Sequence, residues 1–261
     1  MEKIVVSKKI LRVDDKGIHE LDDPVIREVP LTIFLNGKEL VTLLHTPERS
    51  EELAVGFLRS EGLIRRFADI RSLRFDQEQG IVFVETKGNE LAEKLYGKRT
   101  ITSGCGKGTV FYHALDALKS NPVKSEMTIP ARQILALMRQ LQERAELYQQ
   151  TGGIHSSALG SKEGLLYVCE DIGRHNAVDK LIGHCLKEEI DLNEKVLLTS
   201  GRVSSEILIK TAKLSIPVLV SRSAPTELSI ELAINLGITL IGFARGRRFN
   251  IYANQQRIQI N

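Results

Sequence analysis

The chain is 261 residues long, 42% hydrophobic and 26% charged, with a formal net charge of +3 at pH 7. This length suffices to bury one large core or two smaller ones, and the composition is ordinary for a globular protein. So small a net charge does not indicate nucleic-acid binding, and no apolar run approaches the roughly 20 residues of a membrane span. The charged stretch Met1–Lys9 lacks the apolar core of a signal peptide. With three cysteines and no disulfide framework, we expect a cytoplasmic protein without membrane or nucleic-acid partners.

The first predicted elements form a small mixed domain. Two strand-like runs between Leu31 and Leu44 flank Asn36-Gly37, a dipeptide that strongly favours a hairpin turn. Residues 48–58 read as a short helix, and a second hairpin is expected from residues 70–75 and 81–85. Residues 1–122 are therefore predicted to form a smaller mixed α+β domain.

A longer amphipathic helix opens the second half of the chain. Thr128 is the expected N-cap, apolar residues recur at helical spacing from Ile134 to Tyr148, and Gly152-Gly153 ends the helix. Strands are expected next over 154–159, 165–169, 196–200, 217–221 and 238–243, with helices over 175–186, 204–214 and 226–236. This alternation implies right-handed crossovers, so residues 123–261 are predicted to form an α/β domain with a mostly parallel sheet.

Cys105 is the candidate reactive residue. It lies between glycines in Thr102–Thr109, where three glycines within five residues favour a loop. Residues 94–115 contain no Asp or Glu but four basic residues, and nearby positive charge favours the reactive thiolate. Cys169 and Cys185 lie in apolar stretches and are expected to be buried hydrophobes. No Cys-x-x-Cys or His-x-x-x-His pair exists, so neither a zinc site nor a dithiol redox motif is predicted.

Four predicted strand ends carry arginine beside small residues. These segments are Glu170–His175, Ser200–Arg202, Ser221–Ser223 and Phe243–Arg248. Small residues let backbone amides approach an anion, and guanidinium groups match phosphate geometry. The pattern predicts an anionic, phosphate-bearing ligand at the carboxyl ends of the strands. The alternative is that these arginines form structural salt bridges with Asp171, Asp179 or Glu206.

Three further polar residues near these strand ends remain open. His155 and His175 each fit a framework role or a part in the site. Asp171 fits two roles, orienting Arg174 or contacting a ligand hydroxyl. The sequence does not separate these possibilities.

Together these segments resemble the formate dehydrogenase accessory sulfurtransferase family (FdhD/NarQ). The matching pieces run in the family order: Ser103–Gly106, Thr151–His155, Glu170–Lys180, Ser200–Glu206, Ser221–Thr226, Gly242–Arg248 and Asn250–Tyr252. The block Glu170-Asp-Ile-Gly-Arg-His-Asn-Ala is the most specific of them.

The resemblance implies a function beyond what the residues alone indicate. Cys105 would accept sulfur as a persulfide from a cysteine desulfurase. It would pass that sulfur to the molybdenum cofactor, a bis(molybdopterin guanine dinucleotide), before insertion into formate dehydrogenase. The resemblance further implies a homodimer and a cytidine-deaminase-like, three-layer C-terminal domain. The family's cofactor-binding stretch matches Phe243, Ala244, Arg245, Gly246, Arg247 and Arg248.

Two departures limit this transfer. Some family members carry a second loop cysteine where this chain has Gly108, so any two-cysteine relay is in doubt. His155-Ser-Ser157 lacks the glutamate of the deaminase motif, and no zinc is expected. Two alternatives stay open, a cofactor chaperone without covalent sulfur chemistry and a zinc-dependent, deaminase-like enzyme.

Overall fold

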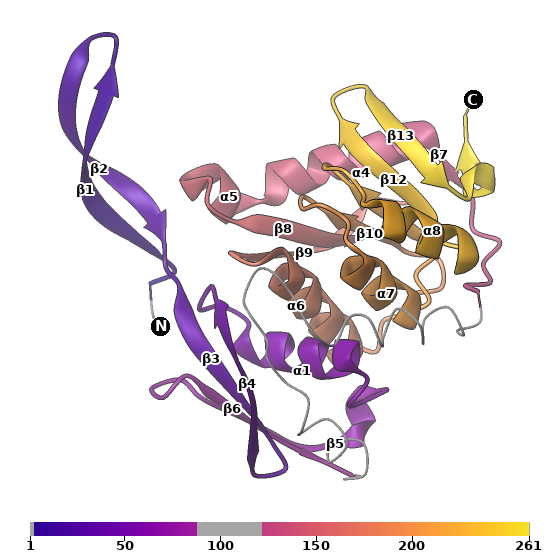
Figure 1. Cartoon of the computed structure of the whole chain (residues 1–261), viewed down its shortest axis with the longest axis horizontal. Coiled ribbons are helices and arrows are strands. Elements are labelled where there is room, and N and C mark those ends of the chain that lie inside the picture. The colour runs from indigo at the N-terminus through magenta and orange to yellow at the C-terminus, as the bar shows by residue number, and fades with distance from the viewer. Residues whose placement is uncertain (1–2, 88–121, 261) are drawn as a thin grey trace.

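A computed structural model describes residues 3–87 and 122–260 of the chain (Figure 1). The candidate nucleophile Cys105 lies outside the described residues. The predicted boundary between residues 122 and 123 is not tested by the structure and stays a prediction.

The N-terminal part contains a four-stranded sheet covered by one helix. Its elements are β3 (Val29–Leu35), β4 (Lys38–His45), α1 (Ser50–Glu61), η1 (Phe67–Asp69), β5 (Ile70–Asp76) and β6 (Ile81–Thr86). The strand order is β4-β3-β6-β5, with β3 and β6 parallel. Leu53 and Leu58 of α1 are fully buried against Leu31 and Ile33 of β3. Both predicted hairpins and the short helix are confirmed.

A further hairpin precedes this sheet and was missed by sequence reasoning. β1 (Val5–Asp14) pairs with β2 (Gly17–Ile26) along its whole length as a separate two-stranded sheet. Figure 1 shows it extending away from the remaining elements. Most of its residues are exposed, so no alternation of buried and exposed positions marks it in the sequence.

The C-terminal part is built on a six-stranded sheet. Its strands are β8 (His155–Gly160), β9 (Leu165–Asp171), β10 (Val196–Thr199), β11 (Val218–Ser221), β12 (Thr239–Arg245) and β13 (Arg248–Ala253). The order is β13-β12-β11-β10-β8-β9, and only the β10–β11 and β11–β12 pairings are parallel. The expected mostly parallel sheet is therefore wrong: the β8–β9 and β12–β13 hairpins make the sheet mixed.

Helices cover both faces of this sheet. The remaining elements are α4 (Ala131–Arg144), α5 (Glu146–Thr151), α6 (Arg174–Lys187), α7 (Ser205–Lys213), α8 (Glu227–Asn235), η2 (Gln255–Arg257) and the short pair β7 (Ile129–Pro130) and β14 (Ile258–Gln259). α6, α7 and α8 pack on one face, and α4 packs on the other through residues such as Leu137 and Met138. The result is a three-layer α/β arrangement within a mixed α/β chain, and the cytidine-deaminase likeness stays a prediction.

The long amphipathic helix differs from its prediction at both ends. Thr128 is not its N-cap, because Ile129 and Pro130 are extended and pair with β14; Pro130 is the N-cap of α4. At Ala145 the backbone leaves helical geometry, with ψ 74°, and α5 starts as a separate helix. The helical segment ends at Gly152, as predicted, and this glycine adopts a left-handed conformation.

α1 and α6 cross at two glycines. A Cβ added to Gly56 would overlap the carbonyl oxygen of Asp179, and one added to Gly183 would overlap that of Glu52. Backbone-to-backbone contact this close requires glycine on both helices. This crossing joins the N-terminal sheet to the C-terminal layers.

We expect Gly183→Ala to lower the free energy of unfolding by about 3 kcal/mol, at the upper end of overpacking costs, because backbone atoms must move. Urea unfolding measures the change. Gly153→Ala is the matched control, since its added Cβ would lie 3.5 Å from Ile26 Cγ2, an ordinary contact. Equal midpoints for the two variants would contradict the account of this crossing.

Candidate functional site

The carboxyl ends of four strands lie at one edge of the six-stranded sheet. β10, β11 and β12 run parallel, so they end on the same side. β8 is antiparallel to both β10 and β9, which places His155 opposite Asp171 at that same edge. The prediction that the arginine-bearing segments after these strands gather at one edge is confirmed.

A cavity of about 420 Å³ opens at this edge. One wall is polar and comes from the strand ends: His155, Ser200, Arg222, Ser223 and Arg245. The other wall is largely apolar and comes from α4, α5 and β12: Met138, Leu141, Ala145, Tyr148 and Phe243. Apolar side chains together with cationic and hydroxyl groups in one cavity suit a ligand with a planar ring and an anionic part.

Three carboxylates are the candidates for neutralising the arginines of this edge. Each has another partner in the structure: Asp171 binds Lys180 at 2.7 Å, Asp179 binds Lys210 at 2.5 Å, and Glu206 binds His175 at 3.0 Å. The structural salt-bridge alternative is therefore wrong for these carboxylates.

The arginines of the edge have no carboxylate ion-pair partner among the described residues. Across residues 3–87 and 122–260, no carboxylate forms an ion pair with Arg174, Arg202, Arg222 or Arg245. Arg174 Nε is buried and has no hydrogen-bond partner in this part of the chain. Leaving a buried guanidinium N–H without an acceptor is costly, so the arrangement favours an anionic ligand.

His155 is the histidine of the cavity. Its Nδ1 lies 3.3 Å from Ser200 Oγ, which also accepts the Ser156 N–H at 3.0 Å. Burial lowers the pKa of His155, and the positive charge of Arg174 lowers it further. His155 is therefore neutral at pH 7 and adds hydrogen-bonding groups to the polar wall without adding charge.

This depressed pKa predicts a pH dependence of stability. When pH falls through about 6.5, the usual histidine pKa, the unfolded chain takes up a proton before the folded His155 does, so the folded state loses stability. We expect the loss of unfolding free energy between pH 7.5 and 5.5 to be larger in the wild type than in His155→Gln. Urea unfolding at both pH values measures it. Equal losses would show that His155 titrates normally in the folded protein.

His175 has a framework role. Its Nε2 lies 3.0 Å from Glu206 and 3.4 Å from Ser204 Oγ, both at the start of α7. The hydrogen bond from His175 lowers the pKa of Glu206, although burial opposes the shift. His175 is not among the residues that line the cavity.

The predicted cofactor-binding stretch divides at the β12–β13 turn. Phe243 and Arg245 line the cavity, and the Arg245 guanidinium lies 5.8 Å from the Phe243 ring centroid. Phe243 has a φ of 53°, a strained conformation for a non-glycine residue. Ala244 is buried in the core on the α4 side of the sheet. The other three residues are exposed at the turn and do not line the cavity: Gly246, Arg247 and Arg248.

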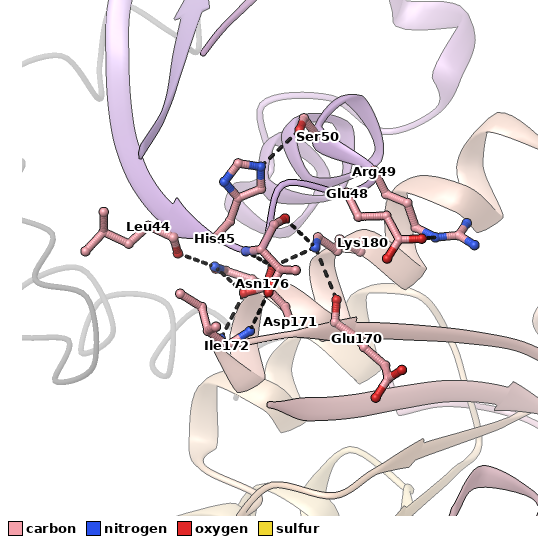
Figure 2. A network of polar contacts seen from close by, with 12 residues as sticks. Leu44, His45, Glu48, Arg49, Ser50, Glu170, Asp171, Ile172, Asn176 and Lys180 are labelled. Atoms are coloured by element: carbon pink, nitrogen blue, oxygen red, sulfur yellow. Dashed lines mark hydrogen bonds and ion pairs between the residues drawn. The ribbon is translucent and has the colours of Figure 1, made fainter. Parts of the chain in front are cut away.

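The block after β9 that carries the family resemblance, within Glu170–Lys180, instead builds the scaffold. Asp171 and Lys180 are fully buried and form an ion pair. Lys180 Nζ also donates to the carbonyls of Thr46 and Glu170, each at 3.1 Å (Figure 2). Asp171 accepts hydrogen bonds from the Thr46 and Gly173 backbone N–H groups and from Asn176. Asp171 therefore neither orients Arg174 nor faces a ligand; it ties α6 to the end of β4.

Glu170 holds the apolar wall in place. Its carboxylate accepts the backbone N–H groups of Leu147 and Tyr148 at 2.9 and 3.0 Å, and the Ser156 hydroxyl at 3.2 Å. Burial raises the pKa of Glu170 against these hydrogen bonds. Because it binds the first turn of α5, Glu170 positions that helix beside the cavity.

The α4–α5 wall is the part of the cavity that sequence reasoning missed. Met138, Leu141 and Tyr148 follow the periodicity of any packed helix, which does not distinguish a ligand-facing position from a core position. The sequence feature that could have indicated this part of the cavity was Gly152-Gly153, since both glycines line it.

Comparison with known proteins assigns the family. The model of the FdhD/NarQ family matches residues 26–259. This chain belongs to the FdhD/NarQ family. The chain is 43% identical to the sulfur carrier protein FdhD of Bacillus subtilis over 259 residues, covering 99% of both chains. It is also 43% identical to the sulfur carrier protein FdhD of Geobacillus kaustophilus, covering 92% of both.

A solved structure supports the fold. A crystal structure from Desulfotalea psychrophila, described as a formate dehydrogenase accessory protein, matches with a TM-score of 0.81. It is 28% identical and covers 98% of this chain and 100% of its own. No helix within residues 3–87 and 122–260 is long and apolar enough to cross a membrane. The same residues contain no cluster of three His, Cys, Asp or Glu side chains placed to hold a metal ion.

Proposed function

We propose that this protein is a cytoplasmic sulfur carrier required for the activity of formate dehydrogenase. Sulfur from a cysteine desulfurase is held on Cys105 and delivered to the molybdenum cofactor, the bis(molybdopterin guanine dinucleotide) substrate, before its insertion. Membership of the FdhD/NarQ family and the similarity to sulfur carrier proteins named FdhD support the role. The observation that carries the ligand assignment is the cavity whose arginines have no carboxylate partner among the described residues.

The first step is a thiolate exchange without net redox change. The Cys105 thiolate attacks the terminal sulfur of the desulfurase persulfide, a new S–S bond forms on Cys105, and the donor cysteine leaves as a thiolate. Lys107 and Arg99 lie near Cys105 in the sequence and favour the anionic forms. One cysteine suffices for this step, so Gly108 does not preclude it.

The second step passes the terminal sulfur to the molybdenum centre of the substrate. Its S–S bond to Cys105 breaks, and Cys105 is released as a thiolate. Because the terminal sulfur is formally zero-valent, its conversion to a sulfido ligand takes two electrons. A reduced molybdenum centre supplies them in our proposal.

The cavity fits the nucleotide part of this substrate. Arg222, Arg245 and Ser223 offer donors to pyrophosphate oxygens, and the buried Arg174 Nε lacks an acceptor within the described residues. The apolar wall with Met138 and Phe243 offers a surface for a planar base. No zinc is part of the proposal.

Binding of GDP, used as a fragment of the substrate, tests the site. Arg245→Ala is expected to weaken GDP binding about tenfold or more, since a charge-assisted hydrogen bond contributes about 1.5–3 kcal/mol. Isothermal titration calorimetry measures the affinity. Arg247→Ala is the matched control, because Arg247 belongs to the same turn but does not line the cavity. Equal GDP affinities for Arg245→Ala and the wild type would contradict the assignment of the nucleotide to this cavity.

A further inference from the structure

The segment from Ala145 to Gly153 forms one side of the cavity and has a hinge at each end. Ala145, Tyr148, Gly152 and Gly153 all line the cavity. At Ala145 the backbone leaves helical geometry with a ψ of 74°, and Gly152 has a left-handed φ of 66°. Positions of this kind at the ends of an element absorb the backbone rotations of a hinge. α5 lies between the two hinges as a short piece of the cavity wall.

Apolar packing contributes little to the position of α5, because none of its residues is buried. Gln149 Nε2 donates to the carbonyls of Gln142 and Glu143 at 2.7 and 3.0 Å, at the end of α4 beside the first hinge. These two bonds tie α5 to α4 and not to the sheet. Within residues 3–87 and 122–260, the hydrogen bonds that join α5 to the six-stranded sheet all go to Glu170 of β9.

Glu170 binds both α5 and β8 without lining the cavity. Its Oε2 accepts the Leu147 N–H at 2.9 Å, and its Oε1 accepts the Tyr148 N–H at 3.0 Å and the Ser156 hydroxyl at 3.2 Å. An ionised carboxylate offers acceptors only, so it satisfies all three donors. A protonated carboxyl presents one O–H donor in place of an acceptor, and its remaining hydrogen bonds lose their charge assistance. The ionisation of Glu170 therefore determines how firmly α5 is held.

The surroundings of Glu170 bring its protonation to a higher pH than that of an exposed glutamate. The charged side chains around it come from four neighbouring segments: Glu48 and Arg49 before α1, Glu146 of α5, Asp171 of β9 and Lys180 of α6. Lys180 donates to the backbone carbonyl of Glu170 at 3.1 Å, and the Glu170 carboxylate points away from it (Figure 2). Burial raises the pKa of Glu170, and the negative charge of Glu48 raises it further.

We propose that Glu170 is a proton-controlled latch for the nucleotide cavity. As a carboxylate it holds α5, and with it Tyr148, against the bound nucleotide; once protonated it releases the first turn of α5, and the wall opens at its two hinges. Nucleotide binding is then linked to proton release, because the nucleotide favours the closed, ionised form. This inference rests on the proposed function, in which a nucleotide occupies the cavity. Acidification thus lowers nucleotide affinity through Glu170.

Isothermal titration calorimetry with GDP at pH 7.5 and pH 5.0 tests the latch. Glu170→Gln keeps the shape of the side chain, but its amide donates a hydrogen bond as the protonated carboxyl does, so it represents the open form at both pH values. We expect this variant to bind GDP about tenfold more weakly than the wild type at pH 7.5. At pH 5.0 the wild type should lose most of this advantage. GDP and His155 titrate in both proteins, so the ratio of the two affinities isolates Glu170.

Glu146→Gln is the matched control, because Glu146 is the exposed first residue of α5 and does not line the cavity. It removes one negative charge from α5 itself and should bind GDP like the wild type at both pH values. Equal affinities for Glu170→Gln and the wild type at pH 7.5 overturn the latch. A ratio of affinities that is the same at pH 5.0 as at pH 7.5 overturns its control by protonation.

Hydrogen exchange in the wild type without nucleotide tests the latch independently of the proposed function and of any variant. Among the described residues, the Leu147 and Tyr148 amides donate to Glu170, so their protection reports the latch. After correction for the intrinsic pH dependence of exchange, we expect this protection to fall about tenfold between pH 7.5 and 5.0, relative to the amide of Leu198 in the core strand β10. Unchanged relative protection overturns the proposal, whether or not GDP binds in the cavity.

Discussion

Replacing Cys105 with Ser is expected to abolish formate dehydrogenase activity in cells that lack the native protein. Serine keeps the size of the side chain but cannot form or release a persulfide, so the sulfur would have no carrier. Formate dehydrogenase activity in extracts measures the effect, and we expect a loss of at least about 100-fold, more than 2.7 kcal/mol in free-energy terms. The variant is expected to bind GDP like the wild type.

Cys185→Ala is the matched control for this loss. Cys185 is 3% exposed on α6, and burial raises the pKa of its thiol to about 12, so it is inert at neutral pH. Its variant should mature the dehydrogenase normally. Full activity with Cys105→Ser, together with intact GDP binding, would instead indicate a chaperone that delivers the cofactor without covalent sulfur chemistry.

Replacing Lys180 with Met is expected to lower the free energy of unfolding by about 3–5 kcal/mol. This is the usual cost of removing one partner of a buried ion pair, because the other charge stays buried without its counterion. Lys180 is fully buried, and its loss leaves the buried Asp171 carboxylate without its cation and removes the Lys180 hydrogen bonds to the carbonyls of Thr46 and Glu170. Urea unfolding of the purified variant measures the change. The contact between the end of β4 and α6 should be the first to be lost on unfolding.

Lys187→Met, on the same helix, is the matched control for this prediction. Lys187 is partly exposed and lies 3.5 Å from Glu51, an ion pair at the surface. Such pairs contribute about 0–1 kcal/mol, so the variant should unfold close to the wild type. If Lys180→Met unfolded no more easily than Lys187→Met, the buried network of Figure 2 would not stabilise the fold as described.

Much of the fold follows from local patterns in the sequence. The Asn36-Gly37 turn and the strand–helix alternation from His155 to Arg245 placed most elements within a few residues of their observed bounds. The relative direction of neighbouring strands could not be predicted from local patterns. Strands joined by a hairpin and strands joined by a helical crossover show the same apolar runs in the sequence. β13 was missed because no strand was predicted after residue 243, and residues 243–248 were interpreted as a ligand-binding stretch.

The site was predictable in outline but not in its partners. His155, Arg222 and Arg245 lie at or just beyond the ends of predicted strands. The order of the elements along the chain therefore indicated that these residues lie at one edge of the sheet. Asp171 could not be assigned, because its partner Thr46 lies 125 positions away in the sequence. Long-range pairing of this kind is set by packing between the N-terminal sheet and α6, which no local pattern encodes.

The measurement that tests the sulfur-carrier account most directly is the intact mass of the protein after incubation with an active cysteine desulfurase and free cysteine, before and after a thiol reductant. We expect a gain of one sulfur atom that maps to Cys105, disappears on reduction and is absent from Cys105→Ser. No gain in mass, with the desulfurase shown to be active, would contradict the claim that Cys105 carries the sulfur.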